Sequence, residues 1–203
     1  MFNTTSFDVF AVAGLAPRMN AIRTHIQPVF REIWEDFCPR VAELHQRDYY
    51  IHIAQHLRRT THAPESTWSA ISTTKRGYKS QPHFQLGIWK DYVFLYLSII
   101  DNPKNEQALA TTLLDNLQVV SQLPEDFIYS VDHTQSPVFS VSSDTLHTDI
   151  TRFRDIKKAE FEVGRILSAD SSLWDKPAAA RDFLWETMVQ LMPLYTLLLP
   201  HID

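Results

Sequence analysis

The sequence predicts an α+β fold in which an antiparallel sheet has helices packed on one face, a two-layer sandwich. Short strand-like segments follow one another between residues 49 and 100, and the links between them are as short as hairpin turns. Segments with helical spacing of apolar residues precede and follow this run. A parallel sheet needs a long crossover after each strand, and residues 49–100 leave no room for one. We expect a single α+β domain over residues 1–203, because no linker-like segment divides the chain.

Three stretches place apolar residues at steps of three and four, which is typical of helices with one buried face. They cover residues 15–37, 109–120 and 175–198. Pro28 should kink the first stretch or begin a second helix within it. Asn102 followed by Pro103 is a typical helix start, so we expect the second helix to begin there.

Alternating polarity and an excess of β-branched and aromatic residues predict the strands. The expected strands are residues 7–12, 49–56, 68–73, 84–88, 92–100, 126–131 and 161–167. The segment 92–100 is apolar on both faces, which favours a central strand that is covered on both sides. Lys90-Asp91 predicts a hairpin turn before it.

Composition excludes several classes of function. The chain has 19 Lys and Arg residues, 24 Asp and Glu residues and a formal net charge of -5, which argues against nucleic-acid binding by bulk electrostatics alone. With four glycines it contains neither GxGxxG nor GxxxxGK[ST], the two common nucleotide-binding loops. No membrane partner is expected, since the apolar runs are far shorter than the ~20 residues of a transmembrane helix.

The single cysteine, Cys38, excludes an intrachain disulfide and favours a reducing compartment. Its apolar neighbours predict a partly buried thiol. The first residues lack the basic and apolar stretches of a secretory signal. We therefore expect a cytoplasmic protein, and we expect it to be a monomer.

Four segments carry a resemblance to a known family. They are FDVFAVAGLAPRM at residues 7–19, HIAQHLRRT at 52–60, KRGYKSQPHFQLGIW at 75–89 and PLY at 193–195. On these segments the chain resembles the YktB-like family of uncharacterised bacterial proteins, a domain of unknown function typical of Firmicutes. The turn THAP at 61–64 departs from the family pattern. The resemblance implies a cytoplasmic protein whose antiparallel sheet packs against long helices, in the manner of TATA-box-binding-like domains, and it implies no activity.

Basic residues concentrate in one segment of this acidic chain. Between residues 58 and 79 a single acidic residue, Glu65, stands against Arg58, Arg59, Lys75, Arg76 and Lys79. Arginine offers paired donors, and lysine a point charge, to phosphate or carboxylate groups. The cluster therefore predicts a site for a small anionic ligand or a phosphodiester. The alternative is a set of solvated charges near sheet edges, where basic residues discourage strand pairing.

Histidines and aromatic residues of the same region complete the predicted ligand-binding site. His52 and His83 would orient the ligand, and Tyr78 and Trp89 would stack against it. Hydrogen-bonded structural histidines and sheet-covering aromatic residues are the alternatives. No metal and no cofactor are expected, because His52 and His56 would lie ~13 Å apart on a strand.

The function hypothesis is a non-catalytic binding module for a small anionic ligand. Two alternatives stay open: an enzyme that uses His52, His56 or His83 for acid–base chemistry on a phosphorylated substrate, and a protein–protein interaction domain. Base stacking on a single-stranded nucleic acid is disfavoured by the net charge. Asp132-His133 is interpreted as a surface turn, because adjacent side chains usually diverge.

Overall fold

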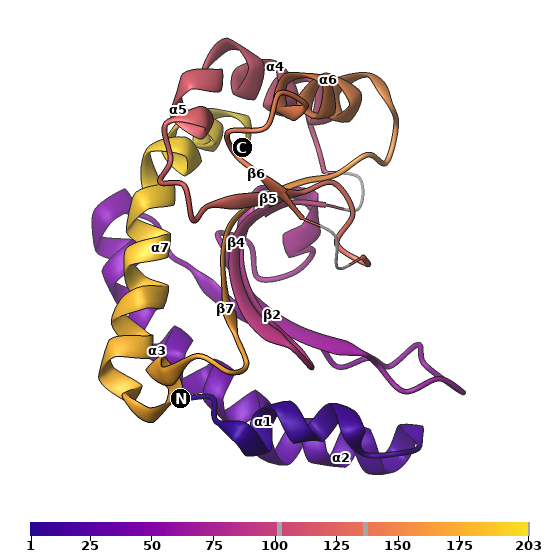
Figure 1. The fold of residues 1–203 in the computed structure, drawn as a ribbon. Coiled ribbons are helices and arrows are strands. Elements are labelled where there is room, and N and C mark those ends of the chain that lie inside the picture. Colours follow the sequence, from indigo (N-terminus) through magenta and orange to yellow (C-terminus); the bar gives the residue numbers. More distant parts are fainter. Residues whose placement is uncertain (101–102, 136–137, 203) are drawn as a thin grey trace. The chain divides into compact units, whose positions relative to one another are not determined.

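The computed structural model describes residues 1–100, 103–135 and 138–202, and its sheet confirms the predicted α+β class. The described strands form one antiparallel sheet of seven, in the order β1-β2-β3-β4-β7-β5-β6, with helices packed against it (Figure 1). They are β1 (Tyr50–Ile53), β2 (Ser66–Ser72), β3 (His83–Trp89), β4 (Tyr92–Ile99), β5 (Ile128–Ser130), β6 (Phe139–Ser140) and β7 (Phe161–Ser168). The likeness to TATA-box-binding-like domains stays an expectation.

The described helices are α1 (Thr4–Asp8), α2 (Leu15–His25), α3 (Gln27–His45), α4 (Glu106–Asp115), α5 (Leu117–Ser121), α6 (Leu146–Asp155) and α7 (Pro177–Leu198). Four short 3-10 helices accompany them: η1 (Val9–Ala11), η2 (Tyr78–Ser80), η3 (Ser172–Asp175) and η4 (Leu199–His201).

The chain divides into two compact units, and each is described by itself. Unit 1 comprises Met1–Thr74, Gln85–Leu95 and Ile166–Glu186, and unit 2 comprises Lys75–Phe84, Tyr96–Arg165 and Thr187–Asp203. Several elements, namely β3, β4, β7 and α7, contribute residues to both units. The single domain over residues 1–203 stays a prediction.

The strand predicted over residues 7–12 is wrong, because this segment is helical, in α1 and η1. Asn3 Oδ1 accepts a hydrogen bond from the Ser6 backbone N–H at 3.2 Å, and Ser6 Oγ accepts one from the Asn3 N–H at 3.3 Å. This reciprocal capping box begins a helix just before the apolar run. Phe7 and Phe10 lie on helical backbone, and their side chains are buried. The helix cap therefore overrides the preference of aromatic residues for strands.

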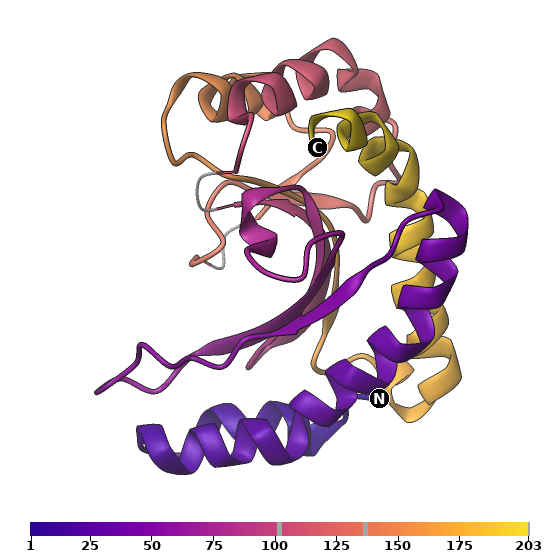
Figure 2. The same cartoon turned by 180° about the vertical axis from the view of Figure 1, so that it is seen from behind.

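The apolar stripe over residues 15–37 is confirmed as two helices of unit 1, α2 and α3. Pro28 lies in the first turn of α3, where its missing N–H removes no helical hydrogen bond. In unit 1, α3 packs against β1 and β2 and lies beside the start of α7 (Figure 2). The Phe37 and Trp185 rings meet edge to face, with centroids 5.1 Å apart.

A buried chain of hydrogen bonds joins α3 to the sheet in unit 1. The Trp34 indole N–H donates to Ser69 Oγ on β2 at 2.7 Å, and the Ser69 hydroxyl donates to the Leu86 carbonyl on β3 at 3.3 Å. All three residues have no exposed surface. Since a buried donor without a partner is costly, Ser69 fixes the position of the Trp34 ring on the sheet.

The predicted hairpin at Lys90-Asp91 is confirmed, since only these two residues separate β3 from β4. On these neighbouring strands the Phe94 ring lies directly over Gly87. A Cβ atom at position 87 would stand 2.1 Å from Phe94 Cζ, far inside van der Waals contact. Gly87 is therefore required by the close approach of a ring to the backbone, a common reason for glycine within a strand.

In unit 2, α4 packs on α6 (Figure 1). The helix predicted over residues 109–120 is two helices, because Asn116 has non-helical backbone angles between α4 and α5. The predicted start at Asn102 lies outside the described residues, and α4 begins at Glu106. Neither α6 nor β6 was predicted, although buried residues of α6 recur at helical spacing: Leu146, Ile150 and Phe153.

The strands predicted at 68–73, 84–88, 92–100, 126–131 and 161–167 are confirmed as β2, β3, β4, β5 and β7. The strand predicted over 49–56 is shorter, because β1 ends at Ile53 and His56 has a left-handed backbone with φ of 51°. The predicted last helix is confirmed as α7. In unit 2, Arg165 of β7 donates from Nε to Thr187 Oγ1 of α7 at 2.8 Å, which joins the sheet to that helix.

We expect Gly87→Ala to lower the free energy of unfolding by about 1–3 kcal/mol, because the added methyl group overpacks the site under the Phe94 ring. Urea denaturation measures the change. Adding Phe94→Leu to this variant should return part of the lost stability. A Gly87→Ala protein as stable as the wild type would contradict the close approach.

We expect Ser69→Ala to cost about 1–3 kcal/mol, because it leaves the Trp34 N–H buried without its acceptor. The matched control is the same substitution in a Trp34→Phe background, where no donor is present and the cost should be smaller. A double-mutant cycle from denaturation curves gives the difference. Equal costs in both backgrounds would show that the hydrogen bond contributes nothing.

Candidate functional site

The ligand residues predicted from the sequence fall into both units. Unit 1 holds His52, Arg58, Arg59 and Trp89, and unit 2 holds Lys75, Arg76, Tyr78, Lys79 and His83. Each group is described within its own unit.

His52 of unit 1 is half-buried on β1 and hydrogen-bonded to neighbouring structure. Its Nε2 lies 3.0 Å from Ser72 Oγ and 3.0 Å from the Thr74 carbonyl oxygen. Burial lowers the pKa of His52, and the hydrogen bond to the Thr74 carbonyl opposes this shift. Trp89 lies at the end of β3, and β2 separates β3 from β1 in the sheet. These contacts fit a structural role for His52.

In unit 2 the structure brings Tyr78 and His83 together. Their rings meet edge to face with centroids 4.9 Å apart, and His83 is fully buried, with Nδ1 2.9 Å from the Gln81 carbonyl oxygen. Lys75 and Arg76 are exposed on the segment before η2. Gly77 has a φ of 74° and turns the chain into that helix.

One predicted ligand residue, Arg59, lines an open groove of unit 1 with a volume of about 300 Å³. One wall is α2, from Leu15 to Arg23, and the other is the segment that follows β1. The lining residues are Leu15, Ala16, Met19, Arg23, Gln55, His56, Leu57 and Arg59. Arg58 is exposed and does not line the groove.

His56 is held firmly in the wall of this groove. Its Nε2 lies 3.0 Å from Thr67 Oγ1, and its ring meets the Trp68 ring edge to face at 5.3 Å. Burial and then the charge of Arg59 lower the pKa of His56 to about 4. The imidazole is therefore neutral near pH 7, and the charges of the groove come from its two arginines.

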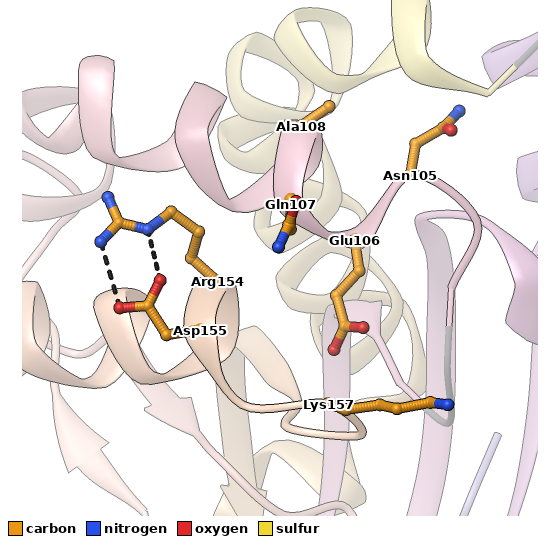
Figure 3. A pocket seen from close by; sticks show the side chains of 7 residues that line it. All are labelled: Asn105, Glu106, Gln107, Ala108, Arg154, Asp155 and Lys157. Atoms are coloured by element: carbon orange, nitrogen blue, oxygen red, sulfur yellow. Dashed lines mark hydrogen bonds and ion pairs between the residues drawn. The ribbon is translucent and has the colours of Figure 1, made fainter.

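The groove differs in charge from two other hollows. A pocket of about 620 Å³ in unit 2 lies between the start of α4 and the end of α6 (Figure 3). Figure 3 shows the Arg154 guanidinium facing the Asp155 carboxylate, with contacts of 2.8 and 3.1 Å. Its other charged residues, Glu106 and Lys157, also have opposite signs. Basic and acidic residues therefore balance in this pocket.

The second of these hollows has a volume of about 260 Å³ and lies in unit 1, where α2 meets α3. Its charged residues are Arg23, Arg31, Glu32 and Glu35, so basic and acidic residues are again equal in number. Of the three hollows, the groove of α2 and the segment after β1 is the one with arginines and no carboxylate among its lining residues.

A polar cluster of unit 2 was missed by the sequence interpretation of Asp132-His133 as a surface turn. The turn exists, but His133 points inward and meets Glu160, with Nδ1 2.7 Å from Oε2. Burial lowers the pKa of His133, but the hydrogen bond and charge of Glu160 outweigh it and raise that pKa. Burial raises the pKa of the neighbouring Glu162 to about 7. No local pattern signals this cluster, because His133 and Glu160 are 27 residues apart in the sequence.

A family model described as a domain of unknown function, DUF1054, matches residues 2–195. The chain belongs to the DUF1054 family. A UPF0637 protein of Enterococcus faecalis is 51% identical over 197 residues, which cover 97% of each chain. A UPF0637 protein of Lactococcus lactis subsp. cremoris is 46% identical over 196 residues, 96% of this chain and 97% of the relative.

A third relative of the DUF1054 chain is the UPF0637 protein YsbB of Lactococcus lactis subsp. lactis, 44% identical over 196 residues, 96% of this chain and 97% of the relative. These matches confirm the resemblance to a family of uncharacterised bacterial proteins. The names of the relatives state no activity, so the function of this DUF1054 chain is argued from its residues. Within the described residues, no helix has the length and apolar character needed to cross a membrane.

We expect stability to fall as the pH drops from about 6.5 to about 4, in part through His56. The pKa of His56 is lowered to about 4 in the folded chain from an ordinary value of 6.5, so in this window the unfolded chain binds more protons and stability rises with pH. Urea denaturation across this range measures it. His56→Asn should show a smaller loss, and an equal loss would contradict the assignment.

Proposed function

We propose that this DUF1054 protein is a non-catalytic binding module for a small organic anion, which it holds in the groove between α2 and the segment after β1. The observation that carries the proposal is the charge of the lining residues: Arg23 and Arg59 face the groove and no carboxylate does. A guanidinium presents paired N–H donors that match the oxygens of a carboxylate or phosphate.

Arg23 lines both the groove and the hollow that Glu32 and Glu35 line, whereas Arg59 lines the groove alone. Arg23 and Arg59 form no ion pair with a described carboxylate, and both are exposed. Arg59 makes one long contact, from Nη1 to the His62 carbonyl oxygen at 3.4 Å. Two unpaired cations beside a hollow favour an anion, because the ligand would gain charge-assisted hydrogen bonds without breaking an existing pair.

The rest of the lining favours an organic ligand over a bare inorganic ion. Leu15 and Ala16 of α2 provide apolar surface, Met19 lines the groove as a buried residue, and Leu57 on the facing segment is 85% exposed. An apolar group bound there would remove this surface from water. A volume of about 300 Å³ suits a small molecule. A long polyanion is less well suited, given the net charge of -5.

The protonation state of His56 favours binding over acid–base catalysis. With a pKa of about 4, its imidazole is a weak base near neutral pH, whereas an efficient general base has a pKa near the working pH. A neutral ring can still exchange a hydrogen bond with a ligand. We therefore retain catalysis on a phosphorylated substrate, and docking of another protein, as alternatives for the binding experiment to decide.

The single cysteine supports our further proposal of a cytoplasmic location. Burial raises the pKa of the Cys38 thiol to about 12, so the thiol is not poised for disulfide exchange. The monomeric state stays a prediction.

The test is calorimetric titration at low salt with inorganic phosphate, glucose 6-phosphate, benzoate and AMP. We expect Arg23→Glu and Arg59→Glu each to weaken the binding of the preferred anion at least about 10-fold, the scale of a lost charge-assisted hydrogen bond. Arg58→Glu is the matched control, because it makes the same charge change at the adjacent residue outside the groove, and it should leave the affinity nearly unchanged.

Other outcomes separate the alternatives. Equal losses in Arg58→Glu and Arg59→Glu would mean bulk attraction and no built groove. If Arg76→Glu lowered the anion affinity and Arg59→Glu did not, the ligand would bind at the other basic residues predicted from the sequence and not in the groove. Conversion of glucose 6-phosphate or AMP to a product, lost in His56→Asn, would favour the enzyme.

A further inference from the structure

The polar cluster of unit 2 brings three metal-ligating side chains together. Asp132 and His133 lie in the turn after β5, and Glu160 lies immediately before β7. One ligand atom from each residue, namely an imidazole nitrogen of His133 and a carboxylate oxygen of each acid, lies within 4.8 Å of the other two. Asp132 and Glu160 are 28 positions apart in the sequence. All three residues belong to unit 2, and none of them lines the anion groove of unit 1.

Strand register explains why they meet. The antiparallel pairing of β5 with β7 sets Ser130 opposite Glu162. The pairing ends there, and Asp132 and Glu160 each lie two residues beyond this last pair, so both follow the same end of the paired strands. The His133 backbone N–H then donates to Glu160 Oε2 at 2.9 Å, which closes the turn onto the start of β7. The cluster is therefore positioned by the sheet and not by mobile side chains alone.

Hydrogen bonds outside the cluster hold the Asp132 carboxylate in place. Asp132 Oδ1 accepts from the Thr134 backbone N–H at 2.9 Å and from its hydroxyl at 2.6 Å. Next to the cluster on β7, Glu162 accepts from the Ser98 hydroxyl at 2.6 Å. Such outer hydrogen bonds are typical of metal sites, where they orient the ligands and tune their basicity.

Three acidic side chains gather in or next to the cluster. Glu160 and Glu162 are 8% and 2% exposed, and two neighbouring buried carboxylates are unfavourable without compensating positive charge. Asp132 adds a third carboxylate. Positive charge reaches these groups from His133, which is charged only when protonated, from Lys79, whose charge acts on His133 and Glu162, and from Arg152, whose charge acts on Asp132. A divalent ion would supply positive charge at the centre of the carboxylates.

We propose that Asp132, His133 and Glu160 bind one divalent transition-metal ion, with Zn²⁺ as the first candidate. One imidazole nitrogen and two carboxylate oxygens form a ligand set that Zn²⁺ accepts, and three protein ligands leave a position for water. Binding requires neutral imidazole, so the proton that His133 Nδ1 shares with Glu160 passes to solvent and the metal takes its place. The contact of 2.7 Å between Nδ1 and Oε2 must then widen to about 3.3 Å to span a tetrahedral ion.

The experiment uses the full chain after treatment with a chelator and its removal. Zn²⁺ is titrated near neutral pH in competition with a chromophoric chelator. We expect one ion per chain, and a loss of affinity of at least about 10-fold in Glu160→Gln and in His133→Ala. His147→Ala is the matched control, because His147 is an exposed histidine of the same unit, and it should bind like the wild type.

A second measurement guards against variants that fail to fold. In the wild-type protein, Mn²⁺ should broaden the amide NMR signals of residues 130–134 and 160–162 before others, and excess Zn²⁺ should restore them. Zn²⁺ affinity that is unchanged in Glu160→Gln and His133→Ala would overturn the proposal. Broadening by Mn²⁺ centred elsewhere, or no stoichiometric Zn²⁺ binding, would overturn it as well and would leave the anion groove unaffected.

Discussion

The position of α3 on the sheet of unit 1 rests on the buried contact of Trp34 with Ser69. An indole N–H that is fully removed from water needs an acceptor, and the Ser69 hydroxyl supplies one while donating to the Leu86 carbonyl. Through this chain the helix, β2 and β3 share one set of hydrogen bonds in a dry environment. The close approach of Phe94 to Gly87 joins β4 to β3. Each neighbour of β3 in the sheet is therefore held by one specific contact, a hydrogen bond from β2 and a ring from β4.

The two candidate sites differ in the elements that carry them. The anion groove is built on α2 and on the segment after β1, where His56 takes a left-handed backbone and is fixed by Thr67 and Trp68. Its arginines are exposed and act through charge. The cluster around His133 lies at the ends of paired strands, and its side chains are tied by hydrogen bonds. The first site therefore suits a ligand that is bound and released, and the second suits an ion that is held.

The electrostatics of the chain differ from what its net charge suggests. A formal charge of -5 hides local groups of opposite sign: Arg23 and Arg59 line one groove without a carboxylate, and Glu160 and Glu162 are buried near each other. In the pocket of Figure 3 and in the hollow between α2 and α3, opposite charges balance. Local pairing, and not total charge, decides which of these surfaces can attract an ion.

The sequence by itself determined the α+β class, most strands, the helices α2, α3 and α7 and the family, because these depend on short-range periodicity and on contiguous motifs. It failed over residues 7–12, where a capping box opposed the strand preference, and at His56, where the strand ended early. Only the tertiary structure decided that Arg59 shares a groove with Arg23, and that His133 faces Glu160. These pairs are set by how α2 approaches the segment after β1 and by the register of β5 on β7, and no local pattern encodes such long-range placement.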